Sequence, residues 1–290
     1  MRLRVHHHTT YSYSEPVTTS HHEAWLSPRD SEVQRTLAHE LEINPSPETR
    51  RRHFDYFGNR TVHFSLSEPH RELDVIATTV VELQASPPPL LARTPPWEAV
   101  VDRLARDRRR DVLEAYAMCF NSPHVAVSPG LHDYARPSFT ANRPILEAVS
   151  NLVSRIHNDF TYDSRATDVS THLNDVLRLR RGVCQDFAHL AIGCLRSFGL
   201  AARYVSGYLV TRPPPGQPKR VGADASHAWF STFLPEHGWV DFDPTNDVIP
   251  TDEHVSMAFG RDFSDVTPIR GVILGGGLHT LRVAVDVNAV

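Results

Sequence analysis

A run of prolines separates two parts of this 290-residue chain that differ in hydrophobic period. Residues 86–97 read SPPPLLARTPPW, and consecutive prolines cannot continue a strand ladder and favour an extended linker. Before them, segments such as LRVHHHTTYSYS and ELDVIATTVVEL alternate or are rich in β-branched residues, with no helical period. We therefore predict an antiparallel β-sandwich over residues 1–85, a proline-rich linker over 86–96 and a second domain over 97–290.

One hairpin within the first part can be placed from its turn. The segment ETRRRHFDYFGNRTVHFSLSE has two β-rich runs on either side of Gly58 and Asn59. Glycine and asparagine adopt positive φ at little cost, so we expect the chain to turn there.

The second part reads as helices followed by strands. Apolar residues at helical spacing predict helices that begin near Trp97 and Ile145, and a third that runs from Cys184 to Phe198 and stops at Gly199. The pattern then changes to strands in ARYVSGYLV, SHAWFSTFL, GWVDFD and HTLRVAVDV. Helices followed by an antiparallel sheet are typical of the α+β class.

The cysteine at position 184 raises the first question of chemistry. Gly182 allows a sharp turn, and Cys184 then lies in the first turn of the predicted helix. Unpaired N–H groups and the positive end of the helix dipole favour a thiolate there, and the same N–H groups could hold an oxyanion. Taken alone, however, a cysteine near a helix is more often a buried packing residue.

A histidine and an aspartate on neighbouring strands favour a nucleophilic role for Cys184 over a packing role. A nucleophilic thiol needs a base, and the base needs a group that orients it. If residues 234–238 form a hairpin turn, Trp229 lies opposite Asp243. His227 is then the diagonal neighbour of Asp243 on the same face. Pro244 then ends the strand and leaves Asp243 at an edge. A different turn length would rotate the face. Alone, each residue also has an ordinary role, as a half-buried strand histidine or as a turn former.

The three sequence blocks that carry these residues resemble a known family. RRGVCQDFAHLAIGCLRSFGLAARYVSGYL, SHAWF and GWVDFDPTN occur in the order found in the transglutaminase-like superfamily of papain-like thiol enzymes, in its bacterial form. The first 85 residues resemble the β-rich N-terminal region that accompanies this core in bacterial members, and the tail GRDFSDVTPIRGVILGGGLHTLRVAVDV resembles their C-terminal segment. The resemblance implies a papain-like core in which helices pack on an antiparallel sheet.

Carried over to this chain, the resemblance implies a catalytic triad. Cys184 would be the nucleophile, His227 the general base and acid, and Asp243 the group that orients the imidazole. Asp241, on the same strand face two residues earlier, is the weaker candidate for that third role.

Two further residues are candidates for substrate binding. Gln185 matches the family's cysteine block and could line the site, although a solvated position in the first helical turn is the more common role. Trp229 could wall the cleft or shield an acyl intermediate, or could simply pack within its strand.

The reaction that the resemblance implies is acyl transfer on a peptide or protein substrate through a thioester. Water as second nucleophile would make the enzyme a cysteine protease or amidase, and an amine would make it a transglutaminase. The triad does not choose between these outcomes, because the choice depends on how the site excludes water and binds an amine. The alternative from another class is a non-catalytic binding or assembly protein on the same scaffold.

Charge and cysteine count limit the partners and the location. With 30 basic and 34 acidic residues the net charge is −4, which argues against bulk binding to nucleic acid or an anionic membrane. The basic run at 103–111 is interrupted by acids and reads as a solvated helix face. Three cysteines, no apolar leader and no run of about 20 apolar residues favour a soluble protein of the reducing cytoplasm.

The histidine triplet at positions 6–8 offers one alternative that involves a metal. His6 and His8 share a strand face and, with His21 and His22, could bind a transition metal. No carboxylate or thiol completes a convincing set, so we predict no metal and no cofactor.

Overall fold

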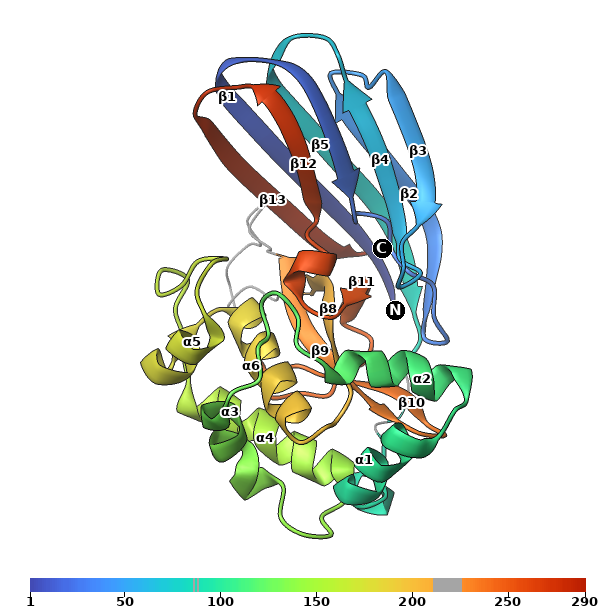
Figure 1. Ribbon diagram of the computed structural model, residues 1–290. Helices are drawn as coiled ribbons and strands as arrows, with labels where there is room; N and C mark the ends of the chain where they lie inside the picture. Colours follow the sequence, from blue (N-terminus) through green and yellow to red (C-terminus); the bar gives the residue numbers. More distant parts are fainter. Residues whose placement is uncertain (86, 88, 211–225) are drawn as a thin grey trace, which may run out of the picture.

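The computed structural model describes residues 1–85, 87, 89–210 and 226–290, and Figure 1 shows a sheet-rich half above a mixed half. Residues 86 and 88 of the predicted linker lie outside the described residues. The first half begins with strands, as predicted. Their bounds are β1 (Arg2–Ala24), β2 (Gln34–Asn44), β3 (Thr49–Phe54), β4 (Arg60–Leu66) and β5 (His70–Leu83).

The hairpin predicted from the Gly58–Asn59 pair is confirmed. Strands β3 and β4 pair in antiparallel fashion, and Phe54 lies opposite Arg60. Gly58 has a φ of +74°, the left-handed conformation for which a glycine is suited.

Strand β1 is long and belongs to two halves of one curled antiparallel sheet. Its residues 2–12 pair with β5, and its residues 20–24 pair with β4, with an irregularity between residues 12 and 17. Side chains from both halves, such as Val75 of β5 and Phe64 of β4, meet in one buried cluster. The curl therefore gives the predicted β unit a core of its own.

The last two strands join this first sheet. β12 (Ile269–Gly275) and β13 (His279–Ala289) both pair antiparallel with β1, and in Figure 1 they lie in red beside the blue strand. The predicted domain division, which places all of residues 97–290 in the second domain, differs from this pairing. A strand's own sequence shows its alternation but not its partner, and Val285 and Val287 are buried here against the first sheet.

The middle of the chain forms the helical layer. Its helices are α1 (Trp97–Arg106), α2 (Arg110–Tyr116), α3 (Pro129–Ala135), α4 (Ile145–Asp159), α5 (Leu173–Leu179) and α6 (Cys184–Ser197). The helices predicted to begin at Trp97, Ile145 and Cys184 are confirmed. Short elements complete the layer: η1 (Leu91–Arg93), η2 (Ala117–Cys119), η3 (Arg136–Ser138), β6 (Thr161–Tyr162) and β7 (Arg181–Gly182).

A second antiparallel sheet lies against this layer. Its strands are β8 (Ala202–Leu209), β9 (Ser226–Leu234), β10 (Gly238–Phe242) and β11 (His254–Gly260), in the order β10-β9-β8-β11, and η4 (Phe263–Asp265) follows. α6 packs on β9 and β8, with its residues from Asp186 to Arg196 buried. The helices and this sheet thus enclose one large apolar core, the α+β core predicted from the sequence.

The two halves are joined by a buried apolar layer and by side-chain hydrogen bonds. Leu3 and Val5 of β1 pack against Val255 of β11. Gln34 Oε1 accepts a hydrogen bond from the N–H of Ser256 at 2.9 Å, and Gln34 Nε2 donates one to the carbonyl of Ser256 at 2.7 Å. The side chain of Asn59 makes the same pair of bonds to Phe259, at 3.0 and 2.9 Å. Two amide side chains of the first half therefore bind the backbone of β11 as a neighbouring strand would.

In the segments that the structure describes, no helix combines the length and the apolar character needed to cross a membrane.

Candidate active site

Cys184 is the first residue of α6, and the preceding turn fixes it. Asp186 reaches back so that its Oδ2 accepts from the N–H of Val183 at 2.8 Å and from Thr167 Oγ1 at 2.6 Å. The bond from Val183 satisfies one of the N–H groups that the start of a helix leaves unpaired. A Cβ at Gly182 would lie only 2.6 Å from Asp186 Oδ2, so glycine is needed where the chain enters the helix.

The β9–β10 hairpin has the register expected from its turn. Gly238 lies opposite Leu234 and Phe242 opposite Phe230. By continuation, Asp243 follows β10 at the position facing Trp229, and His227 is the diagonal neighbour.

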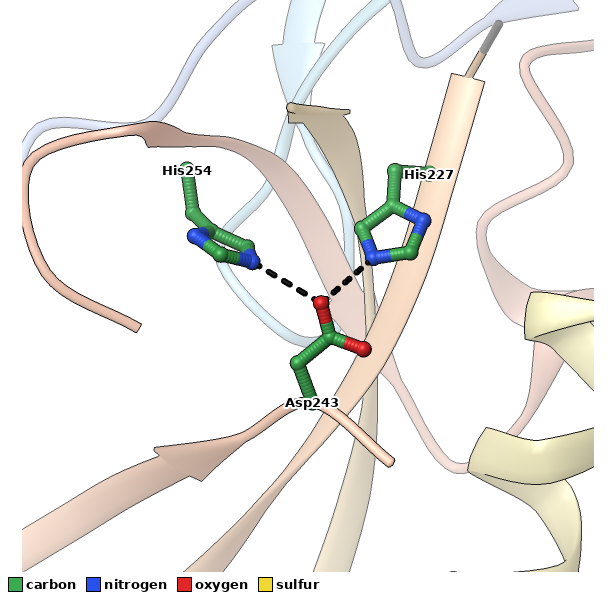
Figure 2. A group of neighbouring side chains, drawn as sticks. All are labelled: His227, Asp243 and His254. Carbon is green, nitrogen blue, oxygen red and sulfur yellow. Dashed lines mark hydrogen bonds and ion pairs between the residues drawn. The ribbon is translucent and has the colours of Figure 1, made fainter. Parts of the chain in front are cut away.

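Asp243 is fully buried and accepts hydrogen bonds at both oxygens. His227 Nε2 donates to Oδ2 at 2.7 Å and His254 Nε2 at 3.0 Å (Figure 2). Asn246 Nδ2 donates to the same oxygen at 2.7 Å. Oδ1 accepts from the backbone N–H groups of Thr245 at 2.9 Å and Asn246 at 3.3 Å. A buried carboxylate needs such partners to remain ionised, and here it has them from two strands and a turn.

His227 interacts with the thiol of Cys184 as well as with Asp243. Burial would lower the pKa of His227, but the hydrogen bond to Asp243 and then the bond and charge of Cys184 raise it from 6.5 to about 9. Burial would raise the pKa of Asp243, but the bonds from His227 and then His254 hold it well below its usual range. The two pKa shifts thus favour the charged form of the imidazole, whose side chain is 10% exposed, next to the charged form of the carboxylate.

The other predicted residues lie around this group in different ways. Asp241 accepts from Trp229 Nε1 at 3.0 Å and from Ser231 Oγ at 2.5 Å, and so supports the strand pair. Gln185, the residue after Cys184, is half-buried in the first turn of α6.

The proposed substrate contact of Trp229 needs correction. Its side chain is 0% exposed, so it offers no surface to a substrate. Its ring instead stacks on His227, with centroids 5.9 Å apart, and meets His254 edge-on at 5.1 Å. Packing within the sheet is therefore its role in this structure.

Sequence reasoning missed three residues of the site. Asn246 belongs to the same DPTN block as Asp243 and could have been found there. His254 lies on another strand, and Tyr162 lies in β6, which pairs with the segment before Cys184 through Gly182. Tyr162 is 57% exposed, and burial together with the charge of Cys184 raises its pKa. The positions of His254 and Tyr162 depend on pairings between distant segments, which no local pattern indicates.

Within the described part of the chain, one group of side chains that could hold a metal ion lies at this same carboxylate. Ligand atoms of His227, Asp243 and His254 lie within 4.8 Å of one another. Both imidazoles donate N–H groups to Asp243, so a cation would have to displace those protons. The histidine triplet at 6–8 has other partners: His6 contacts Thr78, and His7 is buried between Thr9 and Tyr208.

Comparison with known proteins finds two family models that match this chain. The bacterial transglutaminase-like N-terminal region matches residues 3–82, and the transglutaminase-like superfamily matches residues 133–244. The second match contains Cys184, His227 and Asp243.

Relatives extend this similarity over the whole chain. An uncharacterized protein of Mycobacterium tuberculosis (strain ATCC 25618 / H37Rv) is 42% identical over 99% of this chain and 92% of its own length. An uncharacterized protein of Mycobacterium leprae (strain TN) is 35% identical over 99% and 98%. A protein-glutamine gamma-glutamyltransferase of Pseudomonas aeruginosa is 33% identical, but over only 35% of this chain and 16% of that protein.

A solved structure shares the fold from end to end. A crystal structure from Cytophaga hutchinsonii, described as a "putative cysteine protease", superposes with a TM-score of 0.77 over 99% of this chain and 90% of that one. The two sequences are 23% identical, so this comparison concerns the fold.

Proposed function

This chain belongs to the transglutaminase-like superfamily, and on that premise we propose that it catalyses thiol-dependent acyl transfer on peptide or carboxamide substrates. Cys184 is the nucleophile, His227 the general acid and base, and Asp243 the group that orients the imidazole. The observation that carries the proposal is the position of the His227 ring, which interacts with the thiol and donates Nε2–H to a buried carboxylate.

In the first half of the reaction, the thiol becomes acylated. Since Nε2 of His227 donates to Asp243, Nδ1 is the nitrogen left to take the proton of Cys184. The thiolate attacks the carbonyl carbon, and free N–H groups at the start of α6 face the oxyanion. The C–N bond then breaks, the imidazolium gives its proton to the departing amine or ammonia, and a thioester remains.

In the second half, another nucleophile releases the acyl group. His227 takes a proton from water or from an amine, which attacks the thioester carbon, and the C–S bond breaks to restore the thiolate. Asp243 stays ionised throughout, because its pKa is held low, and stabilises the imidazolium that forms in each half. Water gives hydrolysis, and an amine gives a transglutaminase.

The relatives provide support for both outcomes. The similarity to a gamma-glutamyltransferase favours a glutamine carboxamide as acyl donor, and the fold shared with the Cytophaga structure favours peptide hydrolysis.

The test is to incubate the protein with a library of glutamine-containing peptides, with and without a fluorescent primary amine. We expect ammonia release or peptide cleavage with water alone, and label incorporation with the amine if transfer occurs. Cys184→Ala should abolish both, whereas Cys119→Ala should retain them, because burial raises the pKa of that thiol to about 12. Mass spectrometry should find a thioester on Cys184 after acid quenching.

Activity in Cys184→Ala equal to that of the wild type would refute the assignment. A folded wild-type protein with no reaction and an inert Cys184 would favour the binding or assembly protein instead.

A further inference from the structure

A second histidine binds the same carboxylate oxygen as His227. His254 opens β11, on the far side of β8 from β9, and its Nε2 lies 3.0 Å from Asp243 Oδ2 (Figure 2). Its residue is 8% exposed, so the contact is shielded from water. An ionised carboxylate can only accept, so His254 must donate Nε2–H.

This tautomer leaves the other nitrogen of His254 without a partner. Nδ1 is buried and finds no hydrogen-bond partner among the residues that the structure describes. An unsatisfied buried polar atom is unfavourable, and an apolar ring at this place would avoid that cost. A group kept at such a cost needs an explanation beyond packing.

The surroundings place His254 so that it acts on His227 through Asp243. Trp229 lies against both imidazoles. Gly207 of β8, opposite His227, leaves room for this indole, since a Cβ there would lie 2.6 Å from it. His254 and His227 therefore have fixed positions on either side of one carboxylate.

We infer that His254 is a positioning residue, which fixes the Oδ2 oxygen of Asp243 and takes up part of its charge, and so limits how strongly Asp243 holds the His227 imidazolium. The inference rests on the proposed function, in which that imidazolium transfers the proton. Each further donor on a carboxylate weakens its interaction with the others, so His254 keeps His227 able to release its proton in each half of the reaction.

The titratable and charged groups that face His227 can be named from each packed element. α6 contributes Cys184, the turn after β10 contributes Asp243, and β11 contributes His254, whereas the residue opposite on β8 is Gly207. If His254 is removed, Asp243 keeps Asn246 and its two backbone donors, so it stays in place. His227 and Asn246 are then the donors that remain on Oδ2, and His227 interacts with more of the carboxylate charge.

The experiment compares His254→Phe, which keeps a ring against Trp229 but cannot donate, with His254→Gln, which can. The pKa of His227 is measured by NMR titration of ¹⁵N-labelled imidazoles, with the signal assigned by its loss in His227→Asn. We expect His254→Phe to raise the pKa of His227 by about 0.5–1, and His254→Gln to stay within about 0.3 of the wild type. The same spectra should show the His254 proton on Nε2.

An unchanged pKa of His227 in His254→Phe would overturn the inference, as would an equal rise in His254→Gln or a proton on Nδ1 of His254. If His254→Phe does not fold, His254→Asn takes its place, because its shorter amide cannot reach Asp243. The titration needs no substrate. A failure of the proposed function would instead appear as activity that is indifferent to Cys184→Ala.

Discussion

Replacement of Asp243 by asparagine removes the charge on which the proposed site depends while keeping the shape of the side chain. The amide oxygen can still accept from the N–H groups of Thr245 and Asn246. The amide nitrogen, however, would then face three donors, from His227, His254 and Asn246. No rotation of the amide satisfies both sides, since each carboxylate oxygen is an acceptor in the wild type.

The expected effect of Asp243→Asn on the reactivity of Cys184 follows from the pKa of His227. A rise from 6.5 to about 9 corresponds to about 3 kcal/mol in favour of the charged ring. Without Asp243 burial still lowers the pKa of His227 and only Cys184 still raises it, so we expect that pKa to fall. Iodoacetamide reacts with the thiolate, which a neighbouring cation stabilises, so loss of that cation should slow alkylation of Cys184 about 10-fold or more.

The assay is the rate of Cys184 carboxamidomethylation by iodoacetamide at pH 6.5, followed by mass spectrometry of the tryptic peptide. The matched control is Asp241→Asn, the same substitution two residues earlier on the same strand face, where the carboxylate binds Trp229 and Ser231. Circular dichroism establishes that both variants are folded. Equal rates in Asp243→Asn and wild type, or equal slowing in the two variants, would refute the reasoning.

Two further predictions concern the helix start and the pH dependence of folding. In Gly182→Ala the new methyl group would displace Asp186 from the N–H of Val183, and we expect a loss of about 1–3 kcal/mol in urea unfolding together with slower alkylation of Cys184; unchanged values for both would contradict this. The folded pKa of His227, about 9, exceeds its unfolded value of about 6.5, so its contribution is complete below pH 6.5 and is lost as the pH rises through 9. The difference in unfolding free energy between wild type and His227→Gln should therefore shrink from pH 6 to pH 10, and a constant difference would speak against the ion pair.

The parts of the site that obey short-range rules could be predicted from sequence. The register that places Asp243 opposite Trp229 follows from the length of one turn, and period-two alternation then brings His227 to the same face. The helix that begins at Cys184 follows from a glycine and a run of apolar residues. Each of these steps involves residues within about 20 positions of one another, where the chain itself limits the possible arrangements.

The parts that depend on sheet order could not be predicted in this way. His254 reaches Asp243 because β11 pairs with β8 and not with β10, the strand before it in sequence. β12 and β13 carry the alternation of ordinary strands, but their partner is β1, and the paired residues lie at least 245 positions apart. Alternation determines which face of a strand is buried, whereas the choice of partner depends on how the completed faces pack.

The packing of the two sheets also indicates how the first half of the molecule supports the second. β11 is the outer strand of the second sheet, and an outer strand has backbone groups without strand partners. Gln34 and Asn59 satisfy four of those groups, at Ser256 and Phe259. Both amides are buried, so loss of the first half would expose the edge of the strand that carries His254. The N-terminal sheet thus supports the carboxylate group of the site through β11, although Cys184, His227 and Asp243 all lie in the second half.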